Sequence, residues 1–200
     1  KLDDYLSKNK SKKLRGAIIS FIAGQTPDLD KLYEIVAKYK IVLIEDATNA
    51  LGVTYKDDTI GSLKADMTIF SMNPSNGRSS VSNGGVIVTN NEEYAQRSRL
   101  LRTHAISTTY DDYGNLDYIY DVVDIGYKYD MSELEAAFCL AQLQKTNKFI
   151  KRRKEIASIY AKKLSGIKHV NVPSFNEEHI FTQYIIKISK NRDAFARALK

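Results

Sequence analysis

The stretch Ile41-Val42-Leu43-Ile44-Glu45-Asp46 decides the fold of this 200-residue chain. Four aliphatic residues in a row have the length and composition of a strand that is buried on both faces, and the run stops at two acids. Residues 29–39, directly before it, carry apolar side chains at helical spacing. A helix followed by such a strand is typical of a βαβ unit. The stretch therefore predicts an α/β fold, with a mostly parallel sheet between two layers of helices.

The neighbouring segments fit the same three-layer α/β/α pattern. Short apolar runs predict strands over residues 16–22, 67–70 and 86–88, and a helix over 92–102 is opened by Asn90 or Asn91. Residues 103–125 form a loop rich in tyrosine and aspartate, and loops of this length are functional or disordered. These segments make residues 1–130 one large α/β domain.

A long helix is expected to follow that domain. It covers residues 131–164, and Ser132 with Glu135 fits a capping box at its start. Asp130, followed three residues on by Glu133, is a second candidate for the N-cap. Short strands at 170–172 and 184–188 and a final helix come after it. Residues 131–200 are therefore predicted to be a connecting helix and part of a small α+β domain.

The composition excludes several classes of protein. With 43% hydrophobic and 27% charged residues, the chain is neither disordered nor collagen-like. Its N-terminus is polar and no apolar run has the length of a membrane helix, so we expect a cytoplasmic protein without a membrane partner. The single cysteine, Cys139, is expected in the core, and three scattered histidines predict no metal site. The run Lys151-Arg152-Arg153-Lys154 lacks interleaved aromatics, so it predicts a solvated helix face rather than a nucleic-acid site.

Two features of the sequence are unusual. The chain begins at Lys1 and ends at Lys200 inside an amphipathic stretch, so we expect it to be a piece of a longer protein. None of its 21 lysines lies between Ala65 and Tyr127. The net charge of +6 suits an anionic partner but carries no information about the fold.

Candidate chemistry lies at the ends of the predicted strands, where parallel sheets bind ligands. Asp46 ends one strand and is followed by small residues, which leave room for a flat ring such as a protonated pyridine. The alternative is that Asp46 only caps the turn. Ser71 ends another strand and leads into residues 73–80, a loop of hydroxyls, amides and one arginine. Such a loop can cradle a phosphate, and it is equally typical of an exposed turn.

The order of several segments resembles the DegT/StrS family of nucleotide-sugar aminotransferases, which depend on pyridoxal 5'-phosphate (PLP) and have the aspartate aminotransferase fold. The similarity extends over nearly the whole chain. The family's N-terminal third, with its phosphate-binding turn, has no counterpart here. The segments that carry the resemblance are Ile44-Glu45-Asp46-Ala47-Thr48-Asn49-Ala50-Leu51-Gly52, Tyr55-Lys56, Ile60-Gly61-Ser62, Phe70-Ser71, Gly84-Gly85-Val86-Ile87-Val88-Thr89-Asn90, Arg99-Leu100-Leu101-Arg102-Thr103-His104 and Gly126-Tyr127.

The resemblance assigns roles position by position. Asp46 becomes the partner of the pyridine nitrogen, Asn49 the polar residue beside the ring and Ser71 a phosphate ligand. Lys128 stands where the family has an asparagine that reaches the phosphate of the partner subunit's cofactor. His104 follows the family's pattern and is a candidate catalytic residue, although a single histidine near a helix end is more often structural.

The position of the family's Schiff-base lysine, five residues beyond Ser71, is Asn76. A neutral amide cannot hold the cofactor covalently or abstract a proton. The resemblance therefore implies an aminotransferase whose catalytic lysine is replaced, with PLP binding weakened or lost.

Three functions follow from this resemblance. The first is transfer of an amino group from an amino acid to a ketosugar nucleotide by a homodimer, in cell-surface polysaccharide or glycan biosynthesis. The second, sugar dehydration, requires a histidine at the lysine position, which Asn76 does not supply. The third is an inactive relative, or a gene remnant, that binds a sugar nucleotide or partners an active subunit.

Overall fold

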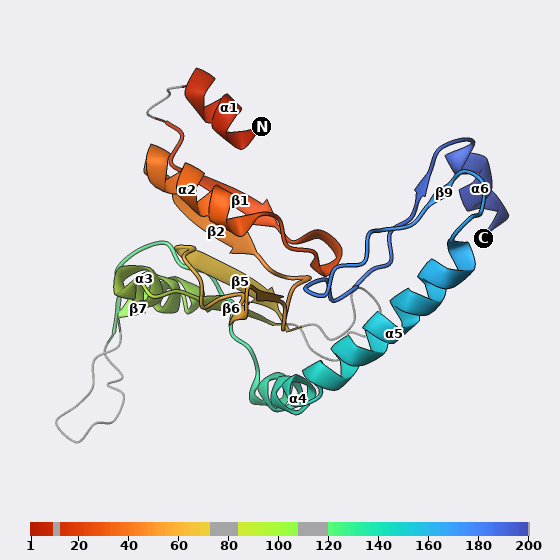
Figure 1. The fold of residues 1–200 in the computed structure, drawn as a ribbon. Coiled ribbons are helices and arrows are strands. Elements are labelled where there is room, and N and C mark those ends of the chain that lie inside the picture. Colours follow the sequence, from red (N-terminus) through yellow and green to blue (C-terminus); the bar gives the residue numbers. More distant parts are fainter. Residues whose placement is uncertain (10–12, 73–83, 108–119, 200) are drawn as a thin grey trace.

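The chain is built around a four-stranded sheet in the order β1-β2-β5-β6, as seen in a computed structural model that describes residues 1–9, 13–72, 84–107 and 120–199 (Figure 1). The strands are β1 (Gly16–Ser20), β2 (Val42–Asp46), β5 (Met67–Ser71) and β6 (Gly85–Val88). The first three run parallel and β6 is antiparallel to β5. The prediction of an α/β fold with a mostly parallel sheet is confirmed.

Two helices, α1 (Leu2–Lys8) and α2 (Leu29–Tyr39), lie together on one side of the sheet (Figure 1). Helix α2 begins at Asp28, whose carboxylate accepts a hydrogen bond from the Lys31 N–H at 3.2 Å, and it ends at the left-handed residue Lys40. Its apolar stripe packs into one core with Leu43 of β2 and Phe70 of β5. The predicted helix over residues 29–39 and its packing on the following strand are confirmed.

A small hairpin of β3 (Thr54–Tyr55) and β4 (Asp58–Thr59) joins β2 to β5 and adds the buried side chains of Val53 and Ile60 to the core. Gly61 follows the hairpin with φ +97°, and a Cβ atom there would lie 3.0 Å from the Phe70 ring. Only glycine fits this position without strain, because both the backbone angle and the contact exclude a side chain.

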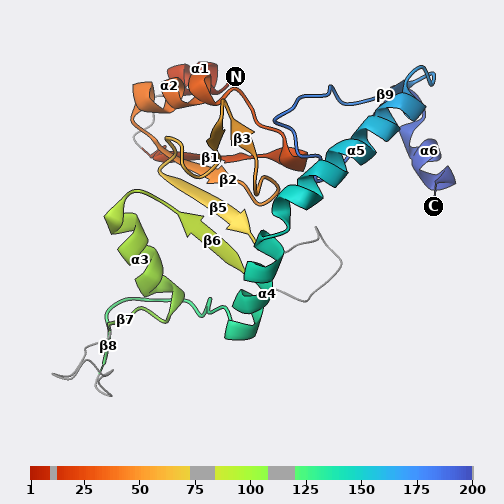
Figure 2. The same cartoon turned by 60° about the horizontal axis from the view of Figure 1, so that its bottom comes forward.

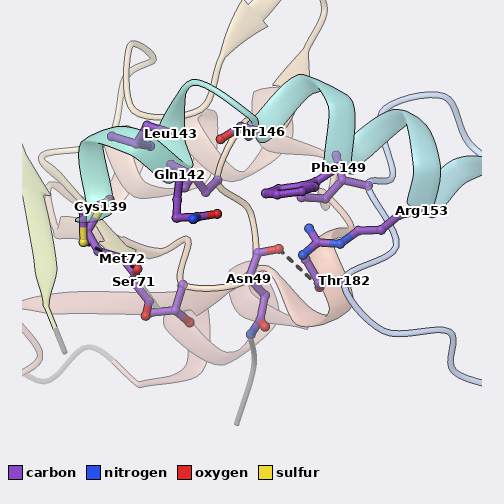
Figure 3. Close-up of a pocket in the computed structure, with 13 residues that line it drawn as sticks. Asn49, Ser71, Met72, Cys139, Gln142, Leu143, Thr146, Phe149, Arg153 and Thr182 are labelled. Carbon is purple, nitrogen blue, oxygen red and sulfur yellow. Dashed lines mark hydrogen bonds between the residues drawn. The ribbon is translucent and has the colours of Figure 1, made fainter. Parts of the chain in front are cut away.

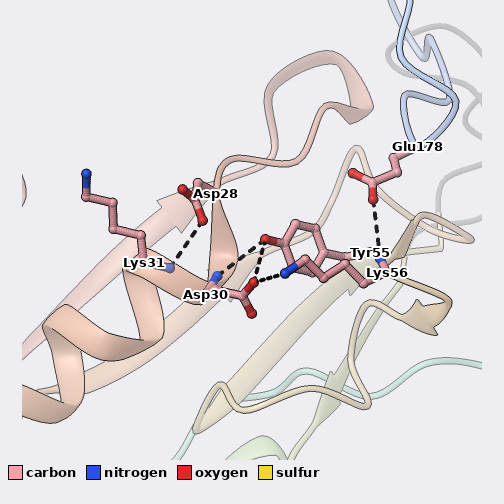
Figure 4. A network of polar contacts seen from close by, with 6 residues as sticks. All are labelled: Asp28, Asp30, Lys31, Tyr55, Lys56 and Glu178. Carbon is pink, nitrogen blue, oxygen red and sulfur yellow. Dashed lines mark hydrogen bonds and ion pairs between the residues drawn. The ribbon is translucent and has the colours of Figure 1, made fainter.

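The hairpin also ties distant segments together (Figure 4). The Lys56 ammonium pairs with Asp30 on α2, and the Tyr55 hydroxyl lies 3.3 Å from the same carboxylate. The Lys56 N–H donates to Glu178 at 3.2 Å, and Thr26 donates to that carboxylate at 3.1 Å. The C-terminal part of the chain is therefore fixed against the beginning of α2.

Beyond β6, helix α3 (Glu92–Arg102) is capped by Asn91, which accepts from the Tyr94 N–H at 3.2 Å. Asn91, rather than Asn90, is the cap. Strands β7 (Ile106–Ser107) and β8 (Asp121–Val122) pair at the ends of the predicted loop, whose residues 108–119 lie outside the described ranges.

The predicted long helix is wrong in one respect, because the structure has two helices, α4 (Glu133–Leu143) and α5 (Thr146–Leu164). The Lys145 N–H bonds to the carbonyl of Gln142, three residues back, so the chain tightens and turns between them. The capping box of Ser132 and Glu135 is confirmed. Asp130 is not the cap; its carboxylate accepts from the Thr103 hydroxyl at 3.3 Å.

After α5 come a short strand pair, β9 (Val170–Asn171) with β10 (Lys187–Ile188), and α6 (Arg192–Ala198). The expected strand over 184–188 is shorter than predicted because the segment before it returns to the sheet. There the N–H groups of Ile180 and Thr182 donate to the carbonyls of Gly24 and Ala23, at 3.2 and 3.1 Å. Those carbonyls belong to the 3-10 turn η1 (Ile22–Gly24) after β1. Within the described ranges, none of the helices has both the length and the hydrophobicity to span a membrane.

Candidate functional site

The carboxylate of Asp46 lies at the end of β2, held by hydrogen bonds from Ser20 and Thr48. Ser20, its register partner on β1, donates from Oγ to Oδ2 at 2.8 Å, and the Thr48 N–H donates to Oδ1 at 3.2 Å. Burial alone raises the pKa of Asp46, but hydrogen bonds from Thr48 and Ser20 outweigh it and lower the pKa below its ordinary value. The side chain is therefore an anion at neutral pH that is only half-buried.

A pocket lies where β2 and β5 end, beside the corner between α4 and α5 (Figures 2 and 3). In Figure 2 the arrowhead of β5 points toward this corner. The cavity volume is about 80 Å³, well below the volume of about 300 Å³ or more that is usual for whole ligands. Its described lining residues are Thr48, Asn49, Leu51, Ser71, Met72, Cys139, Gln142, Leu143, Thr146, Phe149, Arg153, Ile180 and Thr182.

Two of the predicted site residues, Asn49 and Ser71, line this pocket. The backbone carbonyl of Asn49 accepts a hydrogen bond from the Thr182 hydroxyl at 3.4 Å, so the C-terminal segment forms one wall. Asp46 is not among the lining residues. It lies on the sheet face that Ile69 and Ser71 share, because Asp46 pairs with Ile69 and Ser71 is two residues further along β5.

The other predicted residues lie elsewhere. Asn76 is outside the described residues. His104 and Lys128 are neighbours of each other, since the His104 N–H donates to the Tyr127 carbonyl at 2.8 Å and Thr103 forms a β-bridge with Lys128. Both side chains are exposed and neither lines the pocket.

A close backbone contact joins the segment that carries His104 to the segment that carries Lys128. A Cβ atom at Gly126 would lie 2.2 Å from the amide nitrogen of Ala105, so the two backbone segments meet there without space for a side chain. His104 and Ala105 both have positive φ, of 57° and 54°. The positions of His104 and Lys128 therefore depend on backbone geometry, and the structure does not bring them to Asp46 within one chain.

Arg153 is the pocket residue that sequence reasoning missed. The prediction of a solvated face holds for Lys151 and Arg152, which are exposed, and is wrong for Arg153 and Lys154, which are half-buried. Helical spacing carries the signal: Arg153 is three residues after Ile150 and four before Ala157, both on the packed side of α5. Cys139 is buried as expected, with its sulfur 3.8 Å from the Met72 carbonyl.

No group of three or more histidine, cysteine or acidic side chains is placed to hold a metal ion in the ranges that the structure describes. The polar groups at the strand ends are instead a carboxylate, an amide and hydroxyls.

Comparison with known proteins identifies the family. Residues 8–200 match the model of the DegT/DnrJ/EryC1/StrS aminotransferase family. The chain belongs to this family. One relative, the UDP-4-amino-4,6-dideoxy-N-acetyl-beta-L-altrosamine transaminase of Campylobacter jejuni, is 35% identical over 148 residues, which are 73% of this chain and 36% of the relative. The UDP-4-amino-4-deoxy-L-arabinose–oxoglutarate aminotransferase of Shewanella sediminis is 32% identical and matches 89% of this chain.

Solved structures of sugar aminotransferases share the fold. CalS13 from Micromonospora echinospora superposes with a TM-score of 0.80 at 27% identity, over all of this chain and 54% of its own. Spr1654 from Streptococcus pneumoniae, in its PLP form, superposes with a TM-score of 0.81 at 25% identity, over 98% of this chain. The chain spans about half the length, or less, of the relatives that it matches. The PLP form of Spr1654 and the names of these sugar aminotransferases indicate that proteins of this family use PLP and act on sugars.

Proposed function

We propose that this chain provides the cofactor-binding strands of a nucleotide-sugar aminotransferase. The protein would move an amino group from an amino acid such as glutamate to a ketosugar nucleotide, in the cytoplasm, for cell-surface polysaccharide or glycan synthesis. Residues 1–130 would be the large cofactor domain and residues 131–200 would begin the small domain. Two subunits of a homodimer would share the site.

The observation that carries this proposal is the ionised Asp46. Its oxygens accept hydrogen bonds from Ser20 and Thr48, and a carboxylate has about four acceptor sites, so it can still accept from a further donor. A carboxylate with a lowered pKa suits a pyridinium N–H, because it holds the proton on the ring nitrogen without taking it. When bound, PLP supplies the electron sink for the exchange of nitrogen. The residues that the structure describes fit the ring end of this cofactor.

Other residues take supporting roles in the proposal. The Ser71 hydroxyl, at the end of β5, would donate to the cofactor phosphate, and Asn49 would lie beside the ring. Lys128 would reach the phosphate in the partner subunit's site, where its ammonium acts as a point charge. His104, adjacent to Lys128 through the Tyr127 contact, would be presented at the same subunit boundary.

A second function is favoured by Asn76. If no lysine holds the cofactor, PLP is bound only by contacts such as those of Asp46 and Ser71, and its affinity is weakened or lost. The chain would then bind a sugar nucleotide without turnover, or complete the site of an active subunit through Lys128.

Borohydride reduction in the presence of PLP separates the two functions. The chain as it stands is expected to remain unlabelled by mass spectrometry, whereas the variant Asn76→Lys is expected to carry one pyridoxyl group on the new lysine. The double variant Asn76→Lys/Asp46→Ala is the matched control and should label much more weakly. Labelling of an original lysine would contradict the assignment of position 76. No labelling of Asn76→Lys would contradict the cofactor site itself.

A further inference from the structure

The guanidinium of Arg153 is a positive charge without a carboxylate partner in the part of the chain that the structure describes. The side chain is half-buried and points into the pocket beside Asn49 and Thr182 (Figure 3). No ion pair or hydrogen bond joins it to a described acid, and burial lowers the pKa of this arginine. Taking a cation out of water without a counter-ion is costly, so such a charge is typical of a ligand site.

The next residue on the helix provides the contrast. Arg152 donates to Glu155 at 2.9 Å, and both side chains are largely exposed. Successive helical residues differ by about 100° around the axis, so one arginine of the pair faces solvent and the other faces the pocket. The two adjacent arginines therefore have the same chemistry and opposite surroundings.

The rest of the pocket is suited to an anion. Among its described lining residues Arg153 alone is charged, and no acid is present. Gln142 offers an amide N–H₂ group, and Thr146 and Thr182 offer hydroxyls. A cavity of about 80 Å³ is large enough for a carboxylate or a phosphate group but not for a nucleotide.

We propose that Arg153 binds an oxyanion group of a substrate in this pocket, with Gln142, Thr146 and Thr182 as neighbouring donors. Arginine recognises carboxylate and phosphate through the same two-donor fork, so the group comes either from the amino donor or from the nucleotide sugar. The identity of these ligands rests on the proposed function, whereas the existence of the anion site does not.

Calorimetric titration of the full chain, without PLP and at constant ionic strength, tests the site. The probes are succinate, as a dicarboxylate, and inorganic pyrophosphate. At least one probe is expected to bind saturably, and Arg153→Gln is expected to weaken that binding about tenfold or more. Arg152→Gln is the matched control, because it removes the same charge from the neighbouring position and should leave the affinity within about twofold.

The outcomes separate the sources of the anion. Binding of succinate alone assigns the site to the amino donor, and binding of pyrophosphate alone assigns it to a phosphate group, either the nucleotide sugar's or the cofactor's, since Ser71 lines the same pocket. Circular dichroism checks the fold of each variant. If Arg153→Gln is unfolded, Arg153→Lys keeps the charge but loses the fork and is expected to weaken binding severalfold.

Two results would overturn the proposal: no saturable binding of either probe, or equal loss of affinity in the Arg152 and Arg153 variants. Because PLP is absent from the titration, an Arg153-dependent anion site would survive a failure of the cofactor proposal. Conversely, cofactor labelling of Asn76→Lys would stand even if Arg153 proved irrelevant to anions.

Discussion

The two faces of the central sheet differ sharply, although they are formed by the same four strands. On the face under α2, Leu43 and Glu45 of β2 are 0% exposed, and Thr68 and Phe70 of β5 are also buried. The opposite face is open, and Ile18 on this open face is 72% exposed. Side chains alternate along a strand, so a shift of one residue changes the surroundings completely.

Glu45 and Asp46 show what this alternation does to two neighbouring acids. Glu45 accepts hydrogen bonds from the Tyr33 hydroxyl at 2.7 Å and the Thr68 hydroxyl at 2.8 Å, deep in the core. Burial, and then the contact with Glu45, raise the pKa of Tyr33, so this phenol stays protonated. Asp46 has its own donors at the carboxyl end of β2 and is only half-buried. The first acid joins α2, β2 and β5, and the second can meet a ligand.

The largest difference between the faces should appear when an aliphatic side chain is shortened. Leu43→Ala removes fully buried methyl groups and leaves a cavity, so it should lower the free energy of unfolding by about 3 kcal/mol. Ile18→Ala, on the open face, should cost less than about 1 kcal/mol. Urea unfolding followed by circular dichroism measures both variants. Equal losses would mean that the open face is covered in solution and that the comparison of faces fails.

The next largest difference in stability is expected between substitutions of the two acids, Glu45 and Asp46. Glu45→Gln replaces one acceptor oxygen with a donor beside two buried hydroxyls, so it should destabilise the fold by about 2 kcal/mol. Asp46→Asn should cost less than about 1 kcal/mol, because water can satisfy the half-buried amide.

The effect on cofactor binding should be in the opposite order, larger for Asp46→Asn than for Glu45→Gln. Asp46→Asn should reduce labelling by PLP in the Asn76→Lys background more than Glu45→Gln does, provided that both variants are folded. A Glu45 variant that keeps its stability but loses labelling would assign Glu45 to the site instead of the core.

The helix before β2 and the position of that strand were predictable from the sequence because both depend on local patterns. The strand is not buried on both faces as predicted, since Leu43 and Glu45 are buried and Val42, Ile44 and Asp46 are only half-buried. The periodicity of residues 29–39 defined α2, and the run from Ile41 to Asp46 located the sheet. The capping box of Ser132 and Glu135 is likewise local. The resemblance to a family assigned roles to Asp46, Asn49 and Ser71. The structure places Asn49 and Ser71 in one pocket and Asp46 at the end of β2, outside the lining of that pocket.

What the sequence did not predict depends on contacts between distant segments. The turn between α4 and α5 accompanies the packing of Thr146 and Ile150 against Gly52, where a Cβ atom would be 2.8 Å from Ile150. The burial of Arg153 follows from that turn and from Thr182 returning to Asn49. The run of four basic residues by itself gives no sign of either contact, because its charge pattern is the same whether one side chain faces solvent or a pocket; only the helical spacing of Arg153 to Ile150 and Ala157 indicates its burial.

The smallest expected effect concerns the hydrogen bond that distinguishes Asp46. Ser20→Ala removes the 2.8 Å bond to Oδ2, so the pKa of Asp46 should rise toward its ordinary value. A carboxyl whose pKa is lowered by folding stabilises the fold above its unfolded pKa of about 3.9, and this contribution is lost as the pH falls through the folded pKa. The variant should therefore be less stable than the parent by about 0.5–1 kcal/mol at pH 6, and the difference should shrink at about pH 2–3.

The matched control for this pH dependence is Ser62→Ala. The Ser62 hydroxyl donates to the backbone carbonyl of Thr59 at 2.7 Å, and this acceptor does not titrate. The cost of Ser62→Ala should thus be the same at both pH values, measured by urea unfolding. If Ser20→Ala behaved like this control, the hydrogen bond would not be acting on the charge of Asp46. The open face would then hold an ordinary strand-end aspartate, and the distinction from Glu45 would reduce to burial alone.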